Sequence, residues 1–167
     1  VLPQGIGNEW GHVLRAEAAQ ALEEMHAAAS AAGAPFIITS GYRSYDTQLG
    51  LYASYAARSG EAAADTYSAR AGFSEHQTGL AVDLHESTAY CYLQSCFEET
   101  AAGAWLREHA PGFGFVLRYP QGETDVVGYK YEPWHFRYVG RDVALAMREA
   151  GEVNLETFLG LPPAPGY

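Results

Sequence analysis

Residues 73–86, near the middle of the chain, concentrate the side chains that could do chemistry. They read FSEHQTGLAVDLHE, and those able to bind a metal are Glu75, His76, Asp83, His85 and Glu86. Imidazole and carboxylate groups are, beside thiolate, the usual protein ligands of zinc. The stretch therefore indicates either a metal site or an ordinary strand with a polar edge.

The segment 79–85, GLAVDLH, alternates as a half-buried β-strand does. Because successive strand side chains point to opposite faces, one set faces the core: Leu80, Val82 and Leu84. Asp83 and His85 then share the other face. Alternation by itself therefore favours Asp83 and His85 as a pair.

A carboxylate in the middle of this strand needs a partner, because an unpaired buried charge is costly. Gly79 would let the preceding loop fold back and bring His76 towards Asp83. Two pairs stay open from these residues, His76 with Asp83 and Asp83 with His85. In a third interpretation Asp83 pairs with an arginine and both histidines are polar surface residues.

A second segment, GYKYEPWHFRYVG at 128–140, places Glu132 three residues before His135. On a helix both would share a face, but Pro133 and the flanking aromatic residues disfavour a helix. An extended segment with a bulge near Pro133 could aim both side chains at one cavity. The alternative is that His135 only packs among its aromatic neighbours Trp134, Phe136 and Tyr138.

A third segment, SGYRSYDTQLGLY at 40–52, carries Arg43 after a glycine turn and Gln48 in the first turns of a helix. A guanidinium can bind a carboxylate through two parallel hydrogen bonds, which suits recognition of a free chain end. A structural ion pair is the alternative role for Arg43.

Together the segments offer two histidines, one carboxylate and a further glutamate. A catalytic zinc needs about this set: three protein ligands and an open position for water. The spare glutamate would take the water's proton and pass it to the leaving amine.

Helices and strands must position these residues. Apolar residues at helical spacing predict a helix over 12–32 that ends at Gly33. Residues 35–39 predict a buried strand, and Ser44 is a candidate N-cap for a helix over roughly 45–58. Residues 60–72 predict a loop with a short helical piece.

Downstream of 79–85, the pattern predicts strands over 113–120 and 130–140 and helices over 100–109 and 141–151. Helices and strands in this mixed order predict an α+β fold. The length of 167 residues fits one domain, which we place at 1–160, with 161–167 as a tail or linker remnant.

Composition narrows the function classes. A formal net charge of -10 argues against nucleic acid as a ligand. No run of 18 apolar residues occurs, and signal-peptide features are absent. Because the chain begins at Val1, we expect a trimmed chain whose targeting segment was removed.

Cys91 and Cys96 are the two cysteines, five positions apart. They predict a local disulfide if the compartment is oxidising, and the alternative is two unpaired thiols in a loop. No CxxC motif occurs, which excludes a zinc knuckle.

Three stretches, SGYRSYDTQ, SEHQTGLAVD and YEPWHFRYVG, resemble in family order the signature blocks of the VanY-like D-alanyl-D-alanine carboxypeptidases. These are M15-family zinc peptidases that share a fold with the hedgehog signalling domain. The resemblance extends more weakly from about Leu2 to Gly151. It implies a central antiparallel sheet with flanking helices, so that 1–160 would be a single zinc peptidase domain.

The resemblance also implies roles for individual residues. One zinc ion would be held by His76, Asp83 and His135, with Glu132 as the catalytic base. Arg43 would contact the substrate's carbonyl or carboxylate, and Gln48 and Ser74 fall on substrate-binding positions. On this basis Glu75, His85 and Glu86 are not ligands.

The implied activity is removal of the C-terminal D-Ala from peptidoglycan stem peptides or their precursors. Alternatives are an L,D-carboxypeptidase acting on tetrapeptide stems, a non-catalytic zinc module of the hedgehog type, and a metal-free wall-binding domain. We also expect a monomer, an extracytoplasmic location, and a pocket shaped by segments 59–72 and 86–99.

Overall fold

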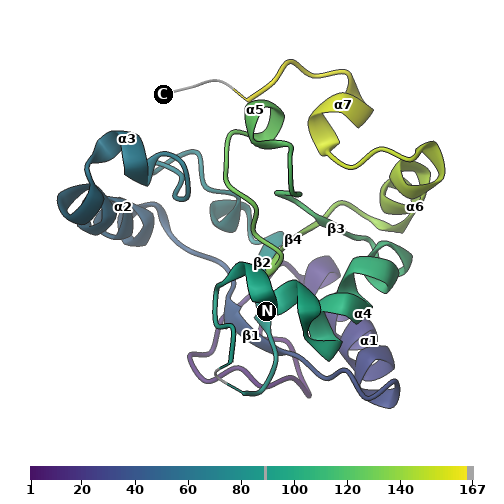
Figure 1. The fold of residues 1–167 in the computed structure, drawn as a ribbon. Helices are drawn as coiled ribbons and strands as arrows, with labels where there is room; N and C mark the ends of the chain where they lie inside the picture. The colour runs from purple at the N-terminus through teal and green to yellow at the C-terminus, as the bar shows by residue number, and fades with distance from the viewer. Residues whose placement is uncertain (89, 165–167) are drawn as a thin grey trace.

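The computed structural model describes residues 1–88 and 90–164. Four antiparallel strands form its sheet: β1 (Ile37–Ser40), β2 (Ala81–His85), β3 (Phe115–Leu117) and β4 (His135–Tyr138). Their order is β1-β2-β4-β3, so β2 and β4 are the central strands, and helices flank them (Figure 1). The predicted α+β fold, with a central antiparallel sheet and flanking helices, is confirmed.

The register of β2 places the central residues of the site. Asp83 is paired with His135 on β4 and with Ser40 on β1. Directly opposite residues of an antiparallel pair lie on the same face of the sheet, with their side chains in contact range. This pairing brings together two residues that are 52 positions apart in the chain.

Seven α-helices are described: α1 (Ala16–Ala31), α2 (Tyr45–Ser59), α3 (Glu61–Ala64), α4 (Ala101–His109), α5 (Thr124–Val127), α6 (Arg141–Ala150) and α7 (Leu155–Leu159). Short 3-10 helices are η1 (Glu75–Thr78), η2 (Ser95–Glu99) and η3 (Ala110–Phe113). Ser44 caps α2, as predicted, by accepting a hydrogen bond from the Thr47 amide.

The main core lies between α1 and one face of the sheet. Leu22 and Met25 of α1 are fully buried and belong to one cluster with Phe36, Val82 and Phe136. Each such side chain stabilises the fold by about 1.5–3 kcal/mol relative to an exposed one. A smaller cluster packs Met147 of α6 against residues of α7.

Helix α1 begins at Ala16, four residues later than the predicted start at 12. The Leu14 amide donates to the Val1 carbonyl, and the Arg15 amide donates to the Gly79 carbonyl. These long-range bonds hold this segment outside the helix, and Arg15, in extended conformation, becomes the N-cap. Helical periodicity could not reveal them, because their partners are remote in sequence.

The other differences concern the C-terminal half. The predicted strands 113–120 and 130–140 are shortened to Phe115–Leu117 and His135–Tyr138, and α5 and α7 were not predicted. The Ala164 amide donates to the Val126 carbonyl at 2.7 Å, so Ala164 lies against α5. The rest of the predicted tail, 165–167, lies outside the described residues.

Across the part of the chain that the structure describes, none of the helices is both long and apolar enough to span a membrane.

Candidate active site

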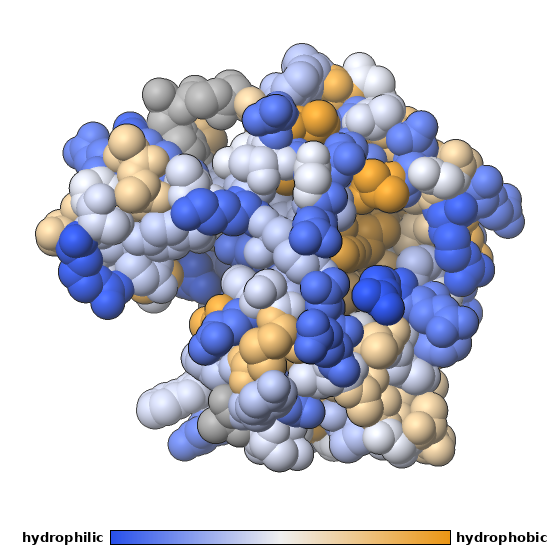
Figure 2. All heavy atoms as spheres, in the orientation of Figure 1, coloured by the Kyte–Doolittle hydropathy of each residue, from blue (hydrophilic) through white to orange (hydrophobic). Residues whose placement is uncertain are grey.

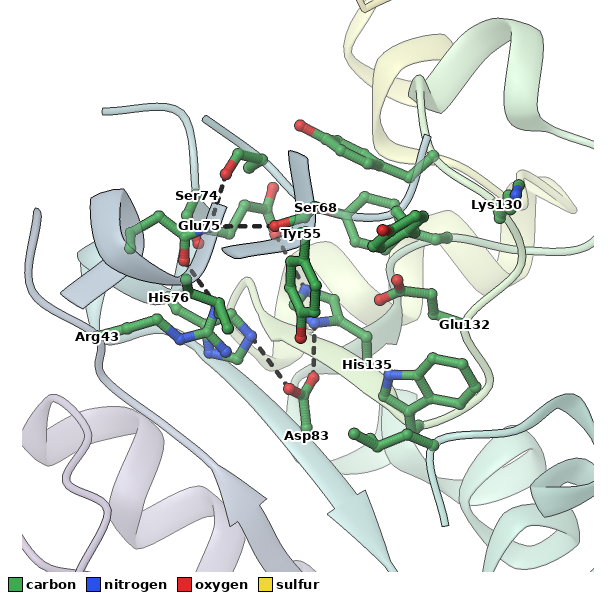
Figure 3. A pocket seen from close by; sticks show the side chains of 18 of the residues that line it. Arg43, Tyr55, Ser68, Ser74, Glu75, His76, Asp83, Lys130, Glu132 and His135 are labelled. Atoms are coloured by element: carbon green, nitrogen blue, oxygen red, sulfur yellow. Dashed lines mark hydrogen bonds and ion pairs between the residues drawn. The ribbon is translucent and has the colours of Figure 1, made fainter. Parts of the chain in front are cut away.

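His76, Asp83 and His135 lie together at the bottom of a pocket (Figure 3). Their candidate ligand atoms all lie within 4.8 Å of one another, and all three residues are buried. Asp83 Oδ1 is 2.8 Å from His135 Nδ1, and Asp83 Oδ2 is 3.3 Å from His76 Nε2. Burial alone would raise the pKa of the Asp83 carboxyl, but the two histidines hold that pKa well below its ordinary value.

His76 reaches Asp83 because the chain folds back before β2. It lies on η1, and Gly79 ends η1 in the left-handed region, with φ of 70°, which glycine adopts readily. His76 Nδ1 lies 2.7 Å from the Gly41 carbonyl oxygen, to which it donates. Nε2 therefore keeps its lone pair and faces Asp83.

The ring of His135 is held on several sides. It stacks on Tyr119 with ring centroids 4.8 Å apart, and it meets the His76 ring edge-on at 5.0 Å. Nδ1 faces Asp83, whereas Nε2 faces the Glu75 carboxylate, with 3.8 Å between Nε2 and Oε2. The orientation of both ring nitrogens is thus fixed.

These residues fit a zinc ion. Two imidazoles and one carboxylate are a donor set that zinc takes, with a fourth position left for water. Metal-binding histidines usually donate their second ring N–H to a carbonyl or carboxylate, and both histidines here face such an acceptor.

Glu132 and His135 are brought to one cavity by a turn. The His135 amide donates to the Glu132 carbonyl at 3.1 Å, and Pro133 occupies the second position of this turn. The assumed bulge in a longer strand was wrong, since β4 begins only at His135. Burial raises the pKa of the Glu132 carboxyl to about 7.

Arg43 lies on the other side of the metal-binding group from Glu132 (Figure 3). Its two terminal nitrogens donate to Gln48 Oε1 at 2.7 Å and to Ser40 Oγ at 2.9 Å. Gln48 is 1% exposed, and its side-chain amide donates to the Ala69 carbonyl at 2.6 Å. Gln48 therefore holds Arg43 in place and has little polar surface left for a substrate.

The pocket has a volume of about 390 Å³. In Figure 2 the surface is hollowed between α2 and α3 and the body of the molecule. Ser74 lines the pocket, as do Tyr67, Ser68, Ala69 and Leu93 from the two predicted pocket segments. Aromatic side chains make up much of the remaining wall: Tyr55, Tyr119, Tyr129, Tyr131 and Trp134.

Comparison with known proteins agrees with this geometry. The family model described as "VanY: D-alanyl-D-alanine carboxypeptidase" matches residues 11–141. The chain belongs to this family. It is 40% identical over 145 residues to the putative carboxypeptidase YodJ of Bacillus subtilis, covering 87% of this chain and 53% of that protein. It is also 40% identical over 124 residues to a D-alanyl-D-alanine carboxypeptidase of Enterococcus faecium, covering 74% and 36%.

Solved structures show the same relationship. The LdcB LD-carboxypeptidase superposes with a TM-score of 0.86 at 36% identity, covering 96% of this chain and 77% of that chain. VanYB in complex with D-alanine-D-alanine superposes with a TM-score of 0.78 at 34% identity, covering 92% and 86%. A VanY mutant solved with Zn(II) superposes with a TM-score of 0.77 at 34% identity, covering 92% of this chain and 87% of that chain. Membership of a carboxypeptidase family and the expected fold are therefore shown, although the chain spans about half or less of the two curated relatives.

His85 lies apart from the metal-binding group of this VanY-family chain. It is 1% exposed and stacks on Phe97 at 5.2 Å, and its Nδ1 lies 2.9 Å from the Glu86 carbonyl oxygen. Leu80, Val82 and Leu84 pack in the core cluster and Asp83 lines the pocket, as the alternation predicts, but the whole of β2 is buried rather than half-buried. Other elements cover both faces, and alternation within one strand cannot show that.

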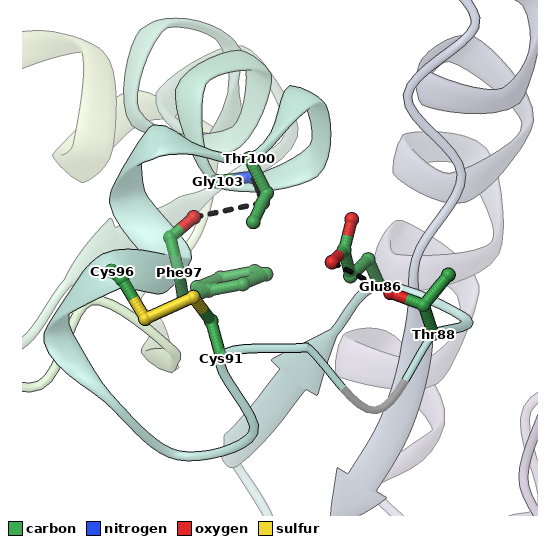
Figure 4. Close-up of a disulfide and its surroundings, with 7 residues drawn as sticks. All are labelled: Glu86, Thr88, Cys91, Cys96, Phe97, Thr100 and Gly103. Carbon is green, nitrogen blue, oxygen red and sulfur yellow. Dashed lines mark hydrogen bonds between the residues drawn. A yellow bond between two sulfur atoms is a disulfide. The ribbon is translucent and has the colours of Figure 1, made fainter.

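The two cysteines of the VanY-family chain are joined in a disulfide, with 5.5 Å between their Cα atoms (Figure 4). The bond closes a short ring around Leu93, which lines the pocket. Cys91 and Leu93 have φ angles of 61° and 49°, a conformation that non-glycine residues seldom adopt. The covalent closure therefore helps to hold a strained pocket rim.

Sequence reasoning missed the role of Glu75, which it named and then set aside as a ligand. Glu75 lies behind His135 and accepts a hydrogen bond from Arg118 Nε at 2.8 Å. Burial by itself would raise the pKa of the Glu75 carboxyl, but His135, Arg118 and Arg137 lower it to about 2. The one signal in the sequence was that Glu75 directly precedes the candidate ligand His76. This position favours a role near the metal but does not show what that role is.

Proposed function

We propose that this domain is a zinc-dependent D,D-carboxypeptidase that removes the C-terminal D-Ala of peptidoglycan stem peptides. The observation that carries the proposal is the meeting of His76, Asp83 and His135 with Glu132 in one pocket. The D-alanine-D-alanine complex of a structural neighbour supports the substrate class.

His76, Asp83 and His135 would hold a single zinc ion, which when bound supplies a Lewis acid and lowers the pKa of water. Glu132 removes a proton from the attacking water and returns it to the departing amino acid. Its position in a turn directly before His135 keeps the base at a fixed place beside the ligands.

Arg43 binds the substrate's carboxylate or developing oxyanion. Its guanidinium is oriented by Gln48 and Ser40 before any substrate arrives, so little side-chain entropy is lost on binding. Ser74, on the pocket wall, is a further substrate-binding residue in this proposal.

An L,D-carboxypeptidase acting on tetrapeptide stems is the second candidate. The TM-score of 0.86 with LdcB exceeds the values of 0.78 and 0.77 with the VanY structures and favours this candidate. A non-catalytic zinc module is disfavoured, because Glu132 and Arg43 are both present in the pocket.

A cell-wall substrate requires that the domain act outside the cytoplasm. The Cys91–Cys96 disulfide supports this location, since such bonds persist mainly in oxidising compartments. We further propose that the domain acts as a monomer.

The test combines metal analysis with defined substrates. Bound zinc is measured first, and release of the terminal residue is then followed with tri-, tetra- and pentapeptide stems, with and without a chelator. Chelator-sensitive release of D-Ala from the pentapeptide supports the D,D activity, and release from the tetrapeptide supports the L,D alternative. Stoichiometric zinc without release from any stem would contradict both.

A further inference from the structure

Two buried polar atoms next to the metal-binding group face each other without a hydrogen-bond partner. They are His135 Nε2 and Glu75 Oε2, and they lie 3.8 Å apart. Among the described residues, the one other buried side-chain atom in this condition is His85 Nε2. Buried polar atoms are rarely left unpaired, so the facing pair calls for a functional reason.

The chemistry of imidazole supplies that reason. His135 Nδ1 faces Asp83 and is the nitrogen available to a metal. A neutral imidazole that binds a metal through the lone pair of Nδ1 must carry its proton on Nε2. This Nε2–H group then needs a hydrogen-bond acceptor. Glu75 Oε2 is an acceptor without a hydrogen-bond partner, and it lies in front of this N–H.

Glu75 is itself held from behind. Its other oxygen, Oε1, accepts from Arg118 Nε at 2.8 Å, and Arg137 Nη1 lies 3.5 Å from Oε2. The side chains of Arg118 and Glu75 are 11% and 19% exposed. A carboxylate fixed by two guanidinium groups cannot readily turn away from the ring.

Arg118 is fixed in turn by the C-terminal helix α7. Its two terminal nitrogens donate to the two carboxylate oxygens of Glu156, at 3.0 and 2.5 Å. This two-point geometry fixes the plane of the guanidinium as well as its position. Glu156 lies beyond residues 11–141, which the family model matches.

We propose that Glu75 is a positioning residue that fixes the ring orientation and tautomer of His135, and that Arg118 and Glu156 lock it there. Helix α7 thereby helps to set the zinc affinity of a site to which it contributes no ligand. The inference rests on the metal site of the proposed function. A buried ion network that serves only stability is the rival explanation.

The test measures metal binding, with Glu75→Ala and Glu75→Gln as variants. Zinc affinity is obtained by competition with a chromogenic chelator, and the visible absorption of the cobalt(II)-substituted protein reports ligand geometry. Removing such a partner typically lowers metal affinity by about 10–100-fold. We expect that loss and an altered cobalt spectrum for Glu75→Ala, and a smaller loss for Glu75→Gln, because its amide oxygen still accepts a hydrogen bond.

A matched control is Glu24→Gln, because Glu24 forms an exposed ion pair with Arg141 at 3.5 Å, on α6. It should leave zinc affinity and the cobalt spectrum unchanged. Thermal unfolding of the metal-free proteins reports stability separately. If Glu75→Ala fails to fold, the zinc affinity of Glu75→Gln still decides whether Glu75 positions His135.

Zinc affinities within twofold of the wild type in the folded Glu75 variants would overturn the inference, even if their thermal stability falls. For α7, Glu156→Gln should weaken zinc binding several-fold, and an unchanged affinity would overturn that part. The proposed function fails separately: a wild-type protein that binds zinc but cleaves no stem peptide refutes the activity and leaves these affinity measurements valid.

Discussion

The His135 amide donates to the Glu132 carbonyl at 3.1 Å, so one turn joins the proposed base to a proposed zinc ligand. The turn fixes the two side chains relative to each other within four residues. The other two candidate ligands, His76 and Asp83, reach the same place from η1 and β2. The site therefore combines one local constraint with two that depend on the tertiary structure.

Glu132→Gln should keep zinc and lose activity. The amide has nearly the same shape but cannot take up a proton, and a general base contributes about 10²–10⁴-fold in rate. The measurement is kcat on a pentapeptide stem, with zinc content as the control. Turnover close to that of the wild type would refute the role of Glu132 as base.

Substitution of the metal ligands should remove zinc. His76→Ala and Asp83→Ala each delete a donor from a group whose ligand atoms lie within 4.8 Å, and each should lose bound zinc in metal analysis. Stoichiometric zinc retained in both variants would refute the assignment of His76 and Asp83 as zinc ligands.

His85→Ala is the control for these two substitutions. It leaves a cavity against Phe97, so the melting temperature should fall while zinc is retained. Loss of zinc from folded His85→Ala would show that His85 supports the metal site, against our assignment.

Arg43→Lys should lower kcat/KM by about 10–100-fold, the worth of one hydrogen bond to a charged group, because lysine keeps the charge but loses the planar two-point geometry. Gln48→Ala should act through Arg43, since Gln48 Oε1 accepts from it. Kinetics of both single variants and of the double variant check this. Non-additive losses are expected, and additive losses would mean that Gln48 acts independently of Arg43.

Replacing both cysteines by serine should lower the free energy of unfolding by about 2 kcal/mol, since the bond closes only a short ring. KM should rise, because Leu93 on this ring lines the pocket. Urea unfolding and steady-state kinetics are the measurements. An unchanged KM would exclude a role of the ring in substrate binding.

The sequence alone was sufficient for the elements whose causes are local. Ser44 predicts the start of α2 because a hydroxyl three residues before an amide caps it. The strand at 81–85 followed from its alternation, and the family blocks singled out the residues that the structure brings together. The start of α1 depends on a remote partner, because the Arg15 amide bonds to the Gly79 carbonyl. The predicted start of this helix was therefore off by four residues.

Tertiary structure decided which of the candidate side chains in 73–86 meet. Alternation within one strand favoured Asp83 with His85, but the pairing of β2 with β4 places His135 opposite Asp83. Strand register is a relation between segments, and no property of either segment alone contains it. The same holds for Glu75, which pairs with Arg118 from 43 positions downstream, and for Arg118, which pairs with Glu156 of α7. Their close approach depends on the packing of α7, which the sequence pattern did not reveal.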